Sequence, residues 1–260
     1  MVSTTDPEGN TFPIEDHFVN RLGLALSFDG SGSAGVAEIP PEAFVPGTTR
    51  LRTAYLATLV DMVAGHAPTG GVGPTVDLRV QLLSSPPSGG TIRLACSPLR
   101  VGRRLIVAQT LLYSQEHPTP FATATTTFIN KYVGGNLDAM PPPAPAVEES
   151  LDAFIGARVR DDRSMELTSR ARIANGLNGT VQGGVQALLA EMTAEHLLGG
   201  GAHMAALDLD IRYLGSVRTG PLVATVVSSP AIHPFAMVHL TDGATGDLVS
   251  HVSLTMEYVA

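Results

Sequence analysis

This chain has only one cysteine and no cluster of basic residues, and each of these two shortages excludes a class of protein. A single cysteine, Cys96, excludes an internal disulfide and fits a reducing compartment, so a cytoplasmic protein is expected. The 16 Lys and Arg residues are outnumbered by 24 Asp and Glu, and Val101 and Gly102 break the densest basic stretch. With a net charge of −8, no nucleic-acid partner is expected.

Long apolar runs are also missing. The first ten residues are polar and carry no apolar h-region, so no signal peptide is expected. Each apolar helix that the pattern predicts is interrupted by an acid, Asp61 or Glu191, so no membrane attachment is expected. The sequence has no H-x-x-x-H, C-x-x-C or G-x-S-x-G motif, which argues against zinc hydrolases and serine hydrolases of the α/β type.

What the chain does have is enough apolar sequence for a large core. Hydrophobic residues make up 44% and charged residues 15% of the 260 residues. Four prolines fall within residues 141–145 and separate two periodic halves. We therefore expect an N-terminal domain at residues 1–135, a proline-rich linker at 136–150 and a C-terminal domain at 151–260.

Each half predicts one long apolar helix followed by four strands. Apolar residues recur at helical spacing within residues 52–66, and Val-, Ile-, Thr- and Leu-rich runs follow at 75–83, 91–98, 105–114 and 120–131. The second half repeats the order, with a strand region at 164–173, a helix at 182–198 and strands at 205–214, 221–228, 235–241 and 247–258.

The two halves align along their length. Helix positions match at an offset of 130, and residues 76–83 match 207–214 at an offset of 131. A helix that is apolar on most sides needs cover on most sides, which a curved sheet supplies. The predicted fold class is α+β, with two antiparallel sheets, each wrapped around a long central helix. Joined edge to edge, such sheets leave fewer open edges.

Residues 30–35 match G-x-G-x-x-G by letter, the pattern of a dinucleotide-binding loop. No helix pattern follows, because Pro40 and Pro41 come next. A hairpin turn is therefore favoured over a nucleotide site.

The whole arrangement resembles the hotdog fold as a tandem, or double-hotdog, chain. The local motif resembles the phenylacetate-pathway type of acyl-CoA thioesterase, which carries N…G-x-x-H-G-G before the central helix and an acid nine positions after the His. Here residues 178–184 read Asn-Gly-Thr-Val-Gln-Gly-Gly, with Gln182 at the His position and Glu191 nine positions later. In the first half Arg52 and Asp61 hold these places. The resemblance covers about residues 45–66, 75–130, 175–198 and 205–258.

The resemblance implies that each active site combines the glycine loop of one half with the helix acid of the other. Asp61 would be the general base or nucleophile, Thr75 would help to hold the water, and the glycine amides at the helix N-terminus would stabilise the oxyanion. The competent site would comprise Asp61, Thr75, Asn178, Gln182, Gly183 and Gly184, with Asn175 as the alternative to Asn178.

The reciprocal site has lost the expected groups. Its loop begins at Arg52 and has no glycine, its acid is the longer Glu191, and Ala206 stands where Thr75 has a hydroxyl. We interpret this site as vestigial, with Glu191 forming a salt bridge to Arg52. Structural readings of the competent site remain open, since a Gly pair can simply permit close packing and Asp61 can be a satisfied buried carboxylate.

The function implied by the resemblance is hydrolysis of acyl-CoA, or of acyl-carrier-protein thioesters, in fatty acid metabolism. It needs no metal or organic cofactor, and two such chains can associate as a homodimer. Low aromatic content favours a fatty-acyl group. A non-catalytic acyl-CoA-binding protein is the alternative, because Gln182 replaces the motif's His. A double-hotdog enoyl-CoA hydratase ranks below both, since the Asp and His at the start of its helix are missing here.

Overall fold

The structure is a computed structural model of the chain. It describes residues 3–5, 11–13, 17–28, 32–65, 73–130, 149–175, 180–199, 203–217, 219–229 and 234–259. Most of the expected linker and Asn178 lie outside these residues.

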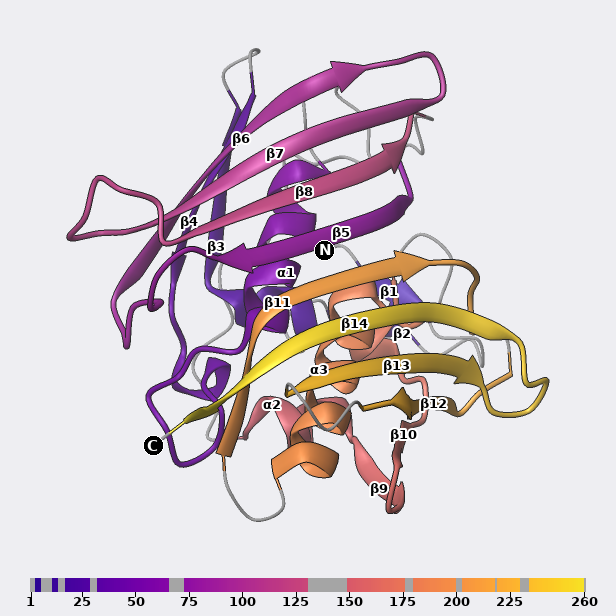
Figure 1. Cartoon of the computed structure of the whole chain (residues 1–260). Coiled ribbons are helices and arrows are strands. Elements are labelled where there is room, and N and C mark those ends of the chain that lie inside the picture. Colours follow the sequence, from indigo (N-terminus) through magenta and orange to yellow (C-terminus); the bar gives the residue numbers. More distant parts are fainter. Residues whose placement is uncertain are drawn as a thin grey trace.

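Twelve strands of the described chain form one continuous antiparallel sheet (Figure 1), in the order β3-β4-β6-β7-β8-β5-β11-β14-β13-β12-β10-β9. The separate pair β1 (Ser3–Thr5) and β2 (Thr11–Pro13) forms a small second sheet. In chain order, the strands of the large sheet are β3 (Leu24–Phe28), β4 (Ser33–Glu38), β5 (Thr75–Leu82), β6 (Thr91–Val101), β7 (Leu105–Ser114), β8 (Ala122–Ile129), β9 (Arg158–Asp161), β10 (Ser164–Leu167), β11 (His203–Tyr213), β12 (Leu222–Ser228), β13 (Phe235–Asp242) and β14 (Leu248–Val259).

The expectation of two sheets, each around its own helix, is corrected by this order. β5 pairs with β11 through five residue pairs and joins the strands of both halves into a single sheet. The physical reason is the one that governs any sheet edge: the backbone N–H and C=O groups of β5 and β11 would otherwise lack partners on one side.

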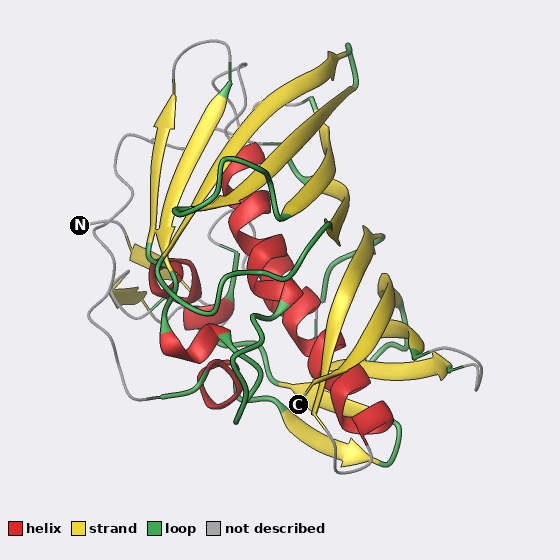
Figure 2. Cartoon of the chain, turned by 60° about the vertical axis from the view of Figure 1, so that its left-hand side comes forward, coloured by secondary structure: helices red, strands yellow, loops and turns green. Residues whose placement is uncertain are grey.

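The two long helices, α1 (Thr53–Ala64) and α3 (Gly183–Gly199), lie against each other and against the sheet (Figure 2). α1 packs on β4 to β8 and β11, and α3 packs on β10 to β14. Ten of the twelve α1 residues are buried, as expected for a helix covered on most sides. No helix of the described residues is long and apolar enough to cross a membrane.

The long helices and the strands that follow them occupy the predicted places. The predicted strand region at 164–173 holds β10 and a short 3-10 helix, η5 (Ala171–Ile173). β3 and β4 pair in antiparallel fashion, which agrees with the expected hairpin. Residues 33–35 of the predicted turn belong to β4, and residues 30 and 31 lie outside the described residues. The short helix α2 (Leu151–Ile155) and strand β9 had no clear sequence signal.

The strand order reads alike from both ends, because each strand of the first half has its counterpart at the same distance from the β5–β11 junction. The register at the junction places Arg79 opposite Asp210, two residues that are equivalent at the offset of 131. An approximate two-fold axis therefore passes between them. Both strands also carry a bulge at matching positions, Thr75/Asp77 in β5 and Ala206/Asp208 in β11.

Candidate active site

Asp61 lies in the last turn of α1, a helix whose other side chains are almost all apolar. Its carboxylate accepts a hydrogen bond of 2.6 Å from the Thr75 hydroxyl. Burial raises the pKa of Asp61 from 3.8 to about 6, and the Thr75 hydrogen bond partly opposes that rise. The carboxylate is thus ionised at neutral pH yet basic enough to accept a proton from a reacting water.

The bulge in β5 brings Thr75 to Asp61. Thr75 pairs with Phe128 and Asp77 with Thr127, so Val76 is the extra residue. Side chains alternate along a strand, and one extra residue reverses the alternation. Without the bulge, Thr75 would share the outer face with Asp77. With it, Thr75 faces the helices.

The N-terminus of α3 lies one helical turn from Asp61. A Cβ added to Gly184 would stand 2.1 Å from the Thr58 Oγ1, so the absence of a side chain permits this contact between α3 and α1. Thr58 and Asp61 are three residues apart and share a face of α1. Gly184 therefore serves close helix packing, which was the structural reading of the glycine pair.

Gln182 caps α3 with its own side chain. Its Oε1 accepts hydrogen bonds from the amides of Gly184, at 2.6 Å, and Val185, at 3.1 Å. This corrects the expectation that both glycine amides face the substrate, because the Gly184 N–H is already satisfied. The Gly183 N–H has no acceptor among the described residues and, as an unpaired donor at a helix N-terminus, can stabilise an oxyanion.

Tyr213, at the end of β11, lies at the candidate site and was not among the residues that the sequence predicted. Its hydroxyl lies 3.0 Å from the point where a Cβ of Gly183 would stand. Burial and the nearby charge of Asp61 raise the pKa of Tyr213 well above its ordinary value. Tyr213 thus links Asp61 to the α3 N-terminus. The alignment of the halves held a signal for it, since the equivalent position in β5 is Leu82.

The reciprocal site is closed by its own acid. Glu191 is fully buried, and its carboxylate accepts hydrogen bonds from the amides of Thr53 (3.2 Å), Ala54 (2.6 Å) and Ala206 (3.3 Å). Thr53 and Ala54 are the counterparts of Gly183 and Gly184. The longer acid therefore occupies the amides at the N-terminus of α1, where a substrate oxygen would need them.

The predicted salt bridge between Arg52 and Glu191 is wrong. The buried Arg52 guanidinium donates instead to Glu195, with Nε–Oε1 at 3.1 Å and Nη2–Oε2 at 2.9 Å, and to Asp152 of α2. Glu191 is turned toward the backbone amides, whereas Glu195, one turn later on α3, reaches the guanidinium. Burial and the charge of Glu195 raise the pKa of Glu191.

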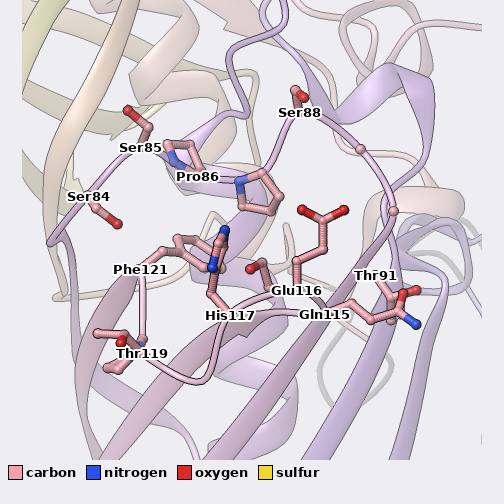
Figure 3. Close-up of a pocket in the computed structure, with 15 residues that line it drawn as sticks. Ser84, Ser85, Pro86, Ser88, Thr91, Gln115, Glu116, His117, Thr119 and Phe121 are labelled. Carbon is pink, nitrogen blue, oxygen red and sulfur yellow. The ribbon is translucent and has the colours of Figure 1, made fainter.

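Two cavities lie elsewhere in the described chain. One, of about 430 Å³, lies between the β5–β6 and β7–β8 loops and includes Pro86, His117 and Phe121 in its lining (Figure 3). The other, of about 290 Å³, is lined by Arg52 and Glu195 on the reciprocal side. Neither of the two is lined by Asp61 or Gly183, so neither locates the chemistry.

Comparisons with known proteins place the fold. No protein-family profile matches the sequence, and no curated protein matches it. Among solved structures, a TesB protein of Mycobacterium avium subspecies paratuberculosis matches with a TM-score of 0.63 at 15% identity, over 92% of this chain and 97% of that one. A protein with a hot dog fold from Alicyclobacillus acidocaldarius matches with a TM-score of 0.60 at 14% identity, over 94% and 98% of the two chains.

The chain has a hotdog fold. A third match, the 12:0-ACP thioesterase of Umbellularia californica, has a TM-score of 0.62 at 12% identity and covers 87% of this hotdog chain and 94% of its own. At such identities the likeness concerns the fold, and the chemistry has to be argued from the residues of this hotdog chain.

Proposed function

We propose that this chain hydrolyses thioesters of acyl-CoA or acyl carrier protein at a site between its two halves. The observation that carries the proposal is the contrast between the two helix acids. Both oxygens of the Glu191 carboxylate accept hydrogen bonds from backbone amides. The Asp61 carboxylate, by contrast, accepts a hydrogen bond only from Thr75 among the described residues. Its carboxylate thus remains able to act on a water next to the N-terminus of α3.

Two further facts support thioester hydrolysis. The pairing of one half's glycine loop with the other half's acid is the plan of the phenylacetate-pathway thioesterases, which the sequence resembles, and we propose that this chain follows it. The Umbellularia protein that shares the fold is a 12:0-ACP thioesterase. A fatty-acyl chain is the substrate group that we favour, since aromatic residues make up only 5% of the sequence.

The reaction needs one base and one oxyanion site. Asp61 removes a proton from water as the water oxygen attacks the thioester carbonyl carbon. The carbonyl oxygen becomes negative and accepts a hydrogen bond from the Gly183 N–H. The tetrahedral intermediate then re-forms its C=O bond, the C–S bond breaks, and the thiolate takes the proton from Asp61. The products are a free carboxylic acid and a free thiol.

The test is hydrolysis of a panel of acyl-CoA and acyl-ACP thioesters by wild type and Asp61→Asn. We expect Asp61→Asn to lower kcat by roughly 10²–10⁴-fold, the usual contribution of a positioned base. Asp162→Asn, at an exposed turn between β9 and β10, is the matched control and should retain full activity. Equal, residual hydrolysis by wild type and Asp61→Asn would instead indicate a non-catalytic acyl-CoA-binding protein.

A further inference from the structure

We propose that the Tyr213 hydroxyl is the second hydrogen-bond donor to the oxyanion, beside the Gly183 amide. The inference rests on the proposed thioester hydrolysis and names a residue that the resemblance did not supply. The amides of Gly184 and Val185 already donate hydrogen bonds to the Gln182 side chain. The N-terminus of α3 therefore has fewer free N–H donors for a substrate than its two glycines suggest.

The strand alternation directs Tyr213 toward this place. Leu209 and Ile211 are buried under the helices, and Tyr213 follows them on the same face of β11. Its ring packs beside Gly183, where an added Cβ would stand 3.0 Å from the hydroxyl oxygen, 3.1 Å from Cζ and 3.2 Å from Cε1. Gly183 thus has a reason to be glycine: any side chain would press on the tyrosine.

The hydroxyl is free to serve a substrate. Tyr213 is half-buried, and its hydroxyl forms no hydrogen bond with another described residue. A tyrosine phenol is already protonated at neutral pH, and burial together with the neighbouring charge of Asp61 raises the pKa of Tyr213 further. A neutral phenol beside a carboxylate and an unpaired amide can donate to an oxygen that becomes negative, and it transfers no proton in doing so.

The donor is present on one side of the molecule only. The equivalent position in β5 is Leu82, which has no polar group, and it lies on the side where Glu191 occupies the amides. Tyr213 thus lies on the same side of the molecule as Asp61, and its counterpart Leu82 lies on the same side as Glu191.

The experiment compares wild type with Tyr213→Phe, which keeps the ring and removes the hydroxyl. We expect kcat to fall by about 10²-fold, as for loss of an oxyanion-hole donor, with KM changed far less. The acidic limb of the pH–rate profile should stay in place, because Asp61 is untouched. Tyr258→Phe, at an exposed tyrosine, is the matched control, and thermal melts confirm that each variant is folded.

The variant Gly183→Ala tests the role of the Tyr213 hydroxyl in a second, independent way. It keeps the amide but pushes on the hydroxyl, so it should lower kcat in wild type and have much less effect in Tyr213→Phe. An unchanged kcat in Tyr213→Phe, a loss confined to KM, or a shifted acidic limb overturns the role of Tyr213 while an inactive Asp61→Asn still supports hydrolysis. A wild type that hydrolyses no thioester overturns both proposals.

Discussion

At the scale of single residues, Asp61 sets the pH range in which the proposed chemistry can run. Its pKa is raised to about 6 by burial, and only the carboxylate form accepts a proton from water. We predict that kcat/KM rises with pH through about 6 and then levels off. A profile of kcat/KM between roughly pH 4.5 and 8.5 checks this, and a rate that falls as pH rises through that region would contradict it.

Thr75 tunes the same group. Its hydrogen bond favours the ionised carboxylate and lowers the pKa of Asp61, so removing it should raise that pKa further. We predict that Thr75→Val moves the acidic limb of the pH profile to higher pH and lowers the rate at neutral pH. Thr75→Ser keeps a hydroxyl and should keep the limb near the wild-type position. A limb that moves to lower pH in Thr75→Val would show that Thr75 acts otherwise.

The alignment of the two halves and the motif resemblance predicted Asp61 and Thr75 as site residues. They did not predict the hydrogen bonds that the surrounding groups form. Both residues stand at fixed spacings from motif positions, and the fold turns such spacings into proximity. The cap formed by Gln182 depends on the rotamer of one side chain, which spacing does not encode. Tyr213 lies far from the motif in sequence, and only the sheet brings its hydroxyl to Gly183.

At the scale of elements, the two helix N-termini are satisfied in different ways. Glu191 accepts from three buried amides, those of Thr53, Ala54 and Ala206. Each orphaned buried donor costs about 1–3 kcal/mol, and such losses overlap. We predict that Glu191→Ala lowers the free energy of unfolding by about 3 kcal/mol or more in urea titrations. Glu191→Gln retains one acceptor oxygen and should lose less, whereas equal losses would mean that the amide contacts matter little.

The crossing of α1 and α3 depends on Gly184. We predict that Gly184→Ala lowers the free energy of unfolding by about 1–3 kcal/mol, as overpacking does, because its Cβ would overlap Thr58. Thr58→Ala should give incomplete relief, since the Thr58 Cβ itself lies 2.7 Å from the added atom. Adding Gly184→Ala to a Thr58→Gly background should be nearly neutral. A full loss in that background would place the clash elsewhere.

Sequence pattern predicted the long elements well because their signals are strong. The two long helices are largely apolar over 12 and 17 residues, and the strands after them are rich in β-branched residues and bounded by turns. The bulges at Val76 and Leu207 escaped prediction, since a bulge is a property of the pairing and not of one strand. α2 is short, with five residues, and has too few turns for a periodic signal.

At the scale of the whole molecule, the approximate two-fold arrangement predicts two sites, and we propose that the residues complete only one. We predict that a non-hydrolysable thioether analogue of acyl-CoA binds with a stoichiometry of one per chain in calorimetric titration. Glu191 blocks the second place by holding the amides of Thr53 and Ala54. Two equal sites per chain would contradict the assignment of the reciprocal site as vestigial.

The sequence pattern predicted two sheets that could join edge to edge, whereas the structure has one continuous sheet. Repeated elements imply two similar halves, and two halves can meet through sheet edges or through other surfaces. In this chain the halves meet through the edges of β5 and β11. Two ion pairs, Arg79–Asp208 and Arg212–Asp77, cross this junction. The ion pairs can be identified only when the register between β5 and β11 is known, and the sequence of one strand does not determine that register.

The position of Arg79 opposite Asp210 has a consequence for how such a chain can assemble. In a dimer of identical subunits, a residue on the two-fold axis faces its own copy, so Arg would face Arg and Asp would face Asp. Like charges directly opposite on neighbouring strands are destabilising. The first half therefore disfavours itself as a partner, the second half does the same, and each favours the other. A single chain can place an Arg opposite an Asp at its pseudo-two-fold axis, because its two halves differ in sequence. The identical subunits of a homodimer cannot do so.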